Sequence, residues 1–150
     1  MALDTSFIGR TYPPTPPYEV GREKIREFAL AIGDDNPVYH DQEAAKALGY
    51  PDVIAPPTFP VLLSHLASRQ LLADPALGVR YDRVVHGEQR FAYTRPVRPG
   101  DRLVAVLTVD NIRQGGGHDI LSVRSEVSTV DGEPVVTVYS TTVVRGEENG

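Results

Sequence analysis

A dense polar stretch, residues 33–41, holds the side chains best suited to chemistry. Within nine residues it carries three carboxylates, a carboxamide, a phenol and an imidazole, which belong to Asp34, Asp35, Asp41, Asn36, Tyr39 and His40. A carboxylate and an imidazole can move protons near neutral pH, so Asp34 and His40 make this stretch a candidate acid–base site. The alternative is that Asp34 and Asn36 only satisfy backbone groups next to a helix end.

Two helices are predicted to position this stretch. Apolar residues in 22–32 recur at the spacing i, i+3, i+4, i+7, at Ile25, Phe28, Ala29 and Ile32, which is one face of a helix. Gly33 stands where a left-handed C-cap belongs, so this helix should end there. Asp41 is the N-cap candidate for a second, short helix over residues 42–48, which Gly49 ends.

A longer helix over residues 59–73 is predicted next, with Thr58 as its N-cap. Its apolar residues cover too wide a surface for one exposed stripe, so it should be largely buried. The second half of the chain reads as four strands, over residues 84–93, 103–110, 120–130 and 135–144. Residues 115–117 and Asp131-Gly132 are predicted to turn the chain between the last three strands.

An antiparallel sheet of this size needs a cover on its apolar face, and the helix over 59–73 is the candidate of adequate length. The predicted class is α+β, with the sheet curled around one long buried helix, which is the outline of a hot-dog fold. The 150 residues should form one such domain, with residues 1–20 as an extended, proline-rich lead-in. Because such a sheet leaves open edges, we expect a dimer.

Composition narrows the classes of function. The net charge is −5, which argues against nucleic acid as a partner. The chain has no cysteine, so disulfides, thiolate metal sites and cysteine nucleophiles are excluded. We find no metal-ligand cluster and no nucleotide-binding glycine motif, so no metal or cofactor is predicted. A membrane span needs about 18 apolar residues, which the sequence lacks, and without a secretory leader the expected location is the cytoplasm.

Several motifs resemble one known family. Residues 33–38, Gly-Asp-Asp-Asn-Pro-Val, resemble the Gly-Asp-x-Asn-Pro-aliphatic core of the MaoC-like (R)-specific hydratases and dehydratases. Residues 48–50, 53–59, 86–91 and 95–101 resemble one branch of it, the FAS1-like N-terminal dehydratase domains. Within that branch the sequence is similar to the A/C-type subunits of mycobacterial (3R)-hydroxyacyl-ACP dehydratase. The similarity spans residues 7–144, nearly the whole chain.

The resemblance implies reversible removal of water from a (3R)-3-hydroxyacyl thioester, a reaction that needs a base, an acid and donors for the carbonyl oxygen. In complete members the motif continues Asp-x-Asn-Pro-x-His, and the Asp and His form the acid–base pair. Here Tyr39 occupies the histidine position and His40 follows one residue later. A phenol with a pKa of about 10 is a poor base at neutral pH, but it could still donate a hydrogen bond, so Tyr39 is a catalytic candidate together with Asp34 and His40. Adjacent side chains of an extended backbone point to opposite sides. His40 could therefore take the role of the histidine only if the loop turns its imidazole to the side on which Tyr39 lies.

The resemblance also implies carbonyl donors at the start of the long helix. The prolines at 56, 57 and 60 have no N–H, so the donors available there are the amides of Thr58, Phe59 and Val61. The predicted substrate-binding residues are Asn36, Thr58, Phe59, His86, Arg95 and Arg98. The arginines over residues 95–102, which include Arg95 and Arg98, are the candidates for the phosphates of the substrate's carrier arm. The alternative for the arginine cluster in 90–102 is a solvated hairpin end.

Three hypotheses about catalysis stay open. Asp34 and His40 could work as a pair despite the shift, the chain could shape the acyl site beside a catalytic partner, or it could form a homodimer with unknown or vestigial chemistry. We favour the second: the substrate-binding subunit of a (3R)-hydroxyacyl-thioester (ACP or CoA) dehydratase or enoyl hydratase of fatty-acid metabolism, with a second hot-dog subunit or a second copy as partner. The alternative is a non-enzymatic acyl-thioester binding module. A hot-dog thioesterase ranks below both, because the helix over 59–73 contains no Asp or Glu.

Overall fold

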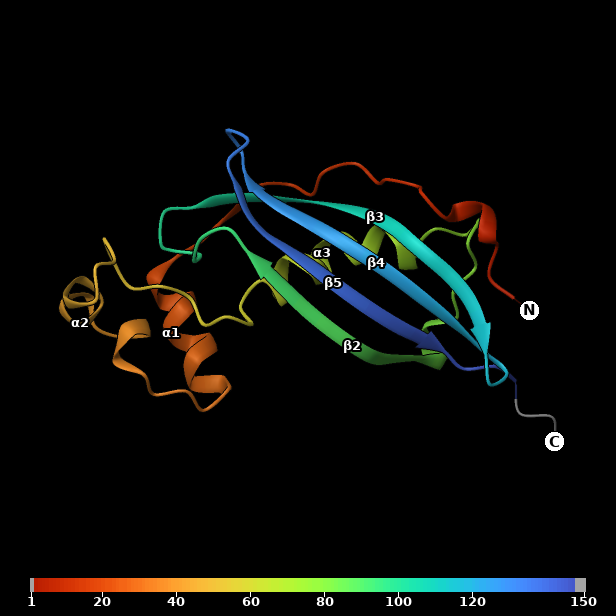
Figure 1. Cartoon of the computed structure of the whole chain (residues 1–150), viewed down its shortest axis with the longest axis horizontal. Helices are drawn as coiled ribbons and strands as arrows, with labels where there is room; N and C mark the ends of the chain where they lie inside the picture. Colours follow the sequence, from red (N-terminus) through yellow and green to blue (C-terminus); the bar gives the residue numbers. More distant parts are fainter. Residues whose placement is uncertain (1, 148–150) are drawn as a thin grey trace.

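One antiparallel sheet organises the computed structural model, which describes residues 2–147 (Figure 1). Its strands are β1 (Tyr18–Glu19), β2 (Val84–Tyr93), β3 (Arg102–Gly115), β4 (His118–Thr129) and β5 (Pro134–Val144). Their order in space is β1-β3-β4-β5-β2, and every neighbouring pair is antiparallel. The four predicted strands are confirmed, and β3 runs five residues further than predicted, to a turn in which Gly116 and Gly117 have the positive φ of a tight hairpin.

The helix α3 (Val61–Leu72) lies across one face of this sheet and packs against β3 and β4. Leu63, Ala67 and Leu71 are buried on one of its faces. Alternate residues of β3 are buried as well: Leu103, Ala105, Leu107 and Val109. Each leucine side chain buried in this layer contributes about 1.5–3 kcal/mol. The predicted α+β hot-dog fold, a sheet curled around one long helix, is confirmed.

The start of α3 differs from the prediction. The helix begins at Val61, its N-cap is Pro60, and no side chain caps it, so the prediction of Thr58 as N-cap is wrong. The reason is a turn that precedes the helix, in which Phe59 N–H donates to the carbonyl of Pro56 at 2.9 Å and Val61 N–H to that of Thr58 at 3.1 Å. Pro60 already has helical φ, so it leads the chain from this turn into the helix.

The residues around the polar stretch form a small helical lobe beyond one end of the sheet (Figure 1). It contains α1 (Arg22–Ala31), the 3-10 turn η2 (Pro37–Tyr39) and α2 (Gln42–Ala47). Gly33 has φ +73°, as its predicted place after the first helix requires. Asp41 accepts a bond from Glu43 N–H at 2.9 Å and so caps α2, as predicted. No helix within residues 2–147 has the length and apolarity needed to cross a membrane.

The lead-in runs beside β3 and covers that edge of the sheet (Figure 1). It is not wholly extended, because Thr5–Phe7 forms a 3-10 turn, η1, where no helix was expected. Its backbone then bonds to β3 through Gly9, Tyr12 and Thr15 at 2.8–3.0 Å. At the opposite edge, the 3-10 turn η3 (Tyr81–Arg83) leads into β2, whose outer side pairs with no other strand of the described chain.

Candidate functional site

Asp34 and Asn36 each use one side-chain oxygen to hold the backbone of the loop over 33–41. Asp34 Oδ1 accepts from the N–H of Asn36 at 3.1 Å, and Asn36 Oδ1 accepts from the N–H of Val38 at 3.1 Å. The second contact caps η2. These contacts are the ones expected under the alternative interpretation, in which Asp34 and Asn36 satisfy backbone groups next to a helix end. Asp34 Oδ2 accepts no hydrogen bond from residues 2–147, so one carboxylate oxygen stays available to a ligand.

The imidazole of His40 contacts the backbone of Asp34 and not its carboxylate. Nε2 lies 3.2 Å from the Asp34 carbonyl oxygen, and since a carbonyl only accepts, Nε2 carries a proton in this contact. His40 also lines a hollow of about 230 Å³ beside Arg22 and Arg26 of α1. Within the described chain, no imidazole pairs with the Asp34 carboxylate. The structure therefore does not join Asp34 and His40 as an acid–base pair.

Tyr39 occupies the interior beside Asp34. It is only 8% exposed. Burial, together with the negative charge of Asp34 and a smaller effect of Tyr50, raises the pKa of the Tyr39 phenol. Burial and the neighbouring Tyr39 likewise raise the pKa of Tyr93. The phenols of Tyr39 and Tyr93 therefore keep their protons at neutral pH, so they can donate hydrogen bonds but cannot act as bases.

The carbonyl donors predicted at the start of α3 are reduced to one. The amides of Phe59 and Val61 are both used inside the turn, as described above. Thr58 N–H has no acceptor among residues 2–147, and Thr58 is exposed. The phenyl ring of Phe59 is fully buried and meets Phe28 edge to face at 5.4 Å. Thr58 therefore offers the free donor, while Phe59 belongs to the core.

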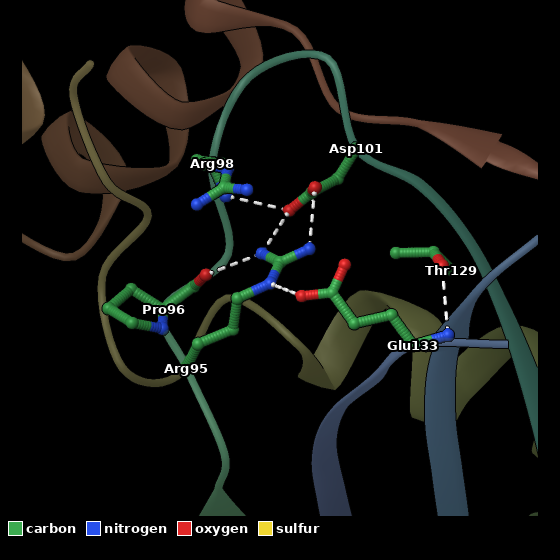
Figure 2. A network of polar contacts seen from close by, with 6 residues as sticks. All are labelled: Arg95, Pro96, Arg98, Asp101, Thr129 and Glu133. Atoms are coloured by element: carbon green, nitrogen blue, oxygen red, sulfur yellow. Dashed lines mark hydrogen bonds and ion pairs between the residues drawn. The ribbon is translucent and has the colours of Figure 1, made fainter. Parts of the chain in front are cut away.

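Arg95 sits at the centre of the polar network that joins the β2–β3 connection to the β4–β5 turn (Figure 2). Its two terminal nitrogens donate to both oxygens of Asp101 at 2.9 Å, and its Nε donates to Glu133 at 2.7 Å. The carbonyl of Pro96 accepts a further bond at 2.9 Å. The guanidinium thus binds acceptors of the protein itself, which favours a structural role for Arg95 over the predicted contact with a ligand.

Arg98 uses only its backbone in this network, where its N–H donates to Asp101 at 3.0 Å (Figure 2). Its guanidinium has no hydrogen-bond or ion-pair partner among residues 2–147. Arg98 and Arg102 line a hollow of about 290 Å³ with Asp131 and Glu133. Of Arg95 and Arg98, Arg98 is therefore the one free to bind an anion, and Arg102, which belongs to the same predicted cluster, lines the hollow with it.

His86 lies away from the polar loop, in a hollow of about 380 Å³ between α3 and the edge of the sheet. Its Nε2 contacts Gln89 Oε1 at 3.0 Å, and His65 of α3 lines the same hollow. The neighbouring Gly87 sits at a bulge, where a Cβ would come within 3.2 Å of the Thr141 carbonyl. The close backbone approach at Gly87 is thus made by β5. The hollow shares no lining residue with residues 33–41.

One residue that the sequence analysis missed joins the end of β2 to the loop before α3. Tyr93, the last residue of β2, donates its hydroxyl to the carbonyl of Pro57 at 2.6 Å. The only signal in the sequence was an aromatic residue at a strand end, and nothing there indicated a contact across 36 positions. Among residues 2–147, no group of three or more His, Cys, Asp or Glu side chains is placed to hold a metal ion.

Comparison with known proteins identifies the family. A model of the FAS1-like dehydratase domain region matches residues 6–138. A UPF0336 protein of Streptomyces avermitilis is 61% identical over 150 residues, which covers both chains in full. The chain belongs to the FAS1-like dehydratase family, as the motifs predicted.

Solved structures of this class agree with the fold. A chain of the C-terminally truncated HadBC (3R)-hydroxyacyl-ACP dehydratase complex of Mycobacterium tuberculosis is 34% identical, with a TM-score of 0.83 over 94% of this chain and 99% of that one. A MaoC-like dehydratase is 33% identical, with a TM-score of 0.86 over 94% of this chain and 43% of that one. The chain is thus a hot-dog protein of the MaoC-like dehydratase class.

Proposed function

We propose that the chain is the substrate-binding subunit of a (3R)-hydroxyacyl-thioester dehydratase or enoyl hydratase, paired with a second hot-dog subunit that supplies the base. One observation carries the proposal: the Asp34 carboxylate has a phenol beside it, while the nearest imidazole, His40, is bound to the Asp34 backbone. A phenol of raised pKa cannot remove the proton next to the thioester carbonyl at neutral pH.

The uncovered edge of the sheet supports a partner. β2 is ten residues long and presents a row of unpaired backbone groups along its outer side. The other edge is covered by the lead-in, so β2 is the edge left for association. Another hot-dog subunit that pairs edge to edge would extend the sheet and satisfy these groups. The related M. tuberculosis protein was solved as a complex, HadBC, which agrees with such a pairing.

Reconstitution tests the proposal. The chain is co-expressed with a hot-dog protein that carries the full Asp-x-Asn-Pro-x-His motif, starting with any such protein encoded beside it. We expect the two to co-purify and to hydrate crotonyl-CoA or a longer enoyl thioester only together. Replacing the partner's motif histidine with alanine should abolish turnover without dissociating the complex. Co-purification without turnover on any of these thioesters would overturn the enzymatic role.

A non-enzymatic acyl-thioester binding module is the second candidate, because the same unpaired Asp34 site favours it. Such a module would bind acyl-CoA or acyl-ACP with the same affinity whether or not a partner is present, and no partner would give turnover. The two candidates therefore differ in whether a partner changes the outcome, which the reconstitution measures directly.

A further inference from the structure

We infer that Tyr93 is a positioning residue, which orients the Thr58 N–H to donate to the carbonyl oxygen of a bound acyl thioester. This rests on the proposed function and deepens it, since it states that this chain holds the thioester group itself and not only the acyl tail. The inference starts from one short contact, the 2.6 Å bond from the Tyr93 hydroxyl to the Pro57 carbonyl.

The Pro57 carbonyl and the Thr58 N–H belong to the same peptide group. That peptide is trans, so its C=O and N–H point in opposite directions from one plane. A bond that fixes the carbonyl toward Tyr93 therefore fixes the N–H on the far side of the plane. A hydrogen bond accepted by a peptide carbonyl also polarises the group and strengthens the bond that its N–H donates.

Tyr93 acts on a peptide inside a turn, which the bond from Phe59 N–H to the Pro56 carbonyl closes around Pro57 and Thr58. Thr58 is the third residue of this turn, and its own N–H has no acceptor among residues 2–147. With prolines at 56, 57 and 60 and the amides of Phe59 and Val61 used internally, the Thr58 amide is the donor left at this end of α3. The hydroxyl of Tyr93 contacts the Pro57–Thr58 peptide from outside the turn, through its hydrogen bond to the Pro57 carbonyl.

Electrostatic effects link Tyr93 to the loop over residues 33–41. The charge of Asp34 contributes to the raised pKa of Tyr39, and Tyr39 contributes to the raised pKa of Tyr93. The raised pKa keeps the Tyr93 phenol protonated, so it can serve as a donor throughout the neutral pH range.

Removing the hydroxyl alone tests the inference. Tyr93→Phe keeps the ring and loses the bond to Pro57, whereas Tyr81→Phe removes an exposed phenol on η3 and serves as the control. The probes are butyryl-, octanoyl- and palmitoyl-CoA with a ¹³C-labelled thioester carbonyl, added to the purified chain alone and to its complex with the partner. Binding is measured by calorimetry, the carbonyl stretch by infrared difference spectroscopy, and the Thr58 amide by ¹H–¹⁵N NMR.

We expect octanoyl- or palmitoyl-CoA to lower the carbonyl frequency on binding and to shift the Thr58 amide signal. In Tyr93→Phe both shifts should shrink and affinity should fall about two- to tenfold, the range of one net hydrogen bond. Tyr81→Phe should match the native protein. If Tyr93→Phe does not fold, a fluorotyrosine at position 93 replaces it, and its more acidic phenol should increase both shifts.

The outcomes separate the two proposals. If the native protein binds none of the acyl-CoA probes, alone or in complex, the proposed function falls and this inference falls with it. If the native protein binds but Tyr93→Phe keeps its affinity, carbonyl frequency and Thr58 signal, the inference alone is overturned. An unchanged carbonyl frequency with fluorotyrosine at position 93 would overturn it in the same way.

Discussion

Arg95 and Arg98 stand three residues apart and have different surroundings. The Arg95 side chain is 15% exposed and its partner Asp101 is 7% exposed, so removing the guanidinium would leave a buried carboxylate without its ion pair. We expect Arg95→Met to lower the free energy of unfolding by about 3 kcal/mol. Arg98→Met removes no partnered group and should change it by less than about 0.5 kcal/mol. Urea unfolding of both variants measures the difference, and equal losses would contradict the network as described.

For acyl-CoA binding, in contrast to stability, we expect Arg98 to be the important arginine of the two. Arg98 has a free guanidinium in the hollow that it shares with Arg102, so Arg98→Glu should weaken acyl-CoA binding by about tenfold at low salt and by less as salt screens the charge. Arg113→Glu, on an exposed part of β3, makes the same change of net charge and is the control. Equal affinities for the two variants at every salt concentration would exclude Arg98 as a phosphate anchor.

At the scale of single residues, the sequence located the candidate site but not its contacts. Residue types and spacing were enough to select Asp34, Asn36 and His40, because the motif is continuous along the chain. Which atom of Asp34 meets the imidazole depends on how η2 turns, and that is set by the Asn36 cap and by burial of Tyr39. Arg95 was expected to bind a ligand because it belongs to a cluster of arginines, and its contact with Glu133, 38 positions away, leaves no local signal in the sequence.

At the scale of elements, a hydrogen bond from one phenol joins the lead-in to the residues that follow α3. The Tyr12 hydroxyl donates to Asp74 at 2.9 Å, and burial and this carboxylate raise the pKa of Tyr12 to about 12. The phenol is held in its protonated form in the fold, whereas in the unfolded chain its pKa is about 10. Its stabilising contribution is therefore complete below pH 10 and is lost as the pH rises from about 10 to about 12.

Tyr12→Phe isolates this effect, because the other tyrosines titrate in both proteins. Near pH 8 the native protein should be more stable than the variant by about 1 kcal/mol, the net worth of a hydrogen bond. That advantage should shrink as the pH rises past 10 and vanish near pH 12. Urea unfolding across this range measures it, and a difference that stays constant with pH would mean that Tyr12 is not held in its neutral form.

The same scale shows why most elements could be predicted and the start of α3 could not. Helix and strand periods are local, and so are the caps at Gly33 and Asp41, which the structure confirms. The beginning of α3 depends on a choice between two local solutions: a Thr58 cap, or a turn that uses the carbonyls of Pro56 and Thr58. The turn prevails because Pro60 can lead directly into the helix, and no pattern of residue types distinguishes the two.

At the scale of the whole molecule, the uncovered edge at β2 predicts association. Val85 on β2 is 45% exposed, and Val130 at the far turn is 42% exposed, so the two provide matched sites for one substitution. Val85→Lys should weaken association of the chain, with a second copy or with the partner, at least about tenfold, or 1.4 kcal/mol. Val130→Lys should leave it unchanged. Sedimentation equilibrium measures both, and equal association of the two variants would exclude β2 as the interface.

The division of labour between subunits is the central claim, and the initial rate of crotonyl-CoA hydration tests it most directly. The rate is measured for the isolated chain, for the complex, and for each with His40→Ala. Because His40 is bound to the Asp34 backbone and Tyr39 cannot act as the base, we predict no turnover from the isolated chain. The rate of the complex should be unchanged by His40→Ala. Full turnover from the isolated chain, abolished by His40→Ala, would contradict the account.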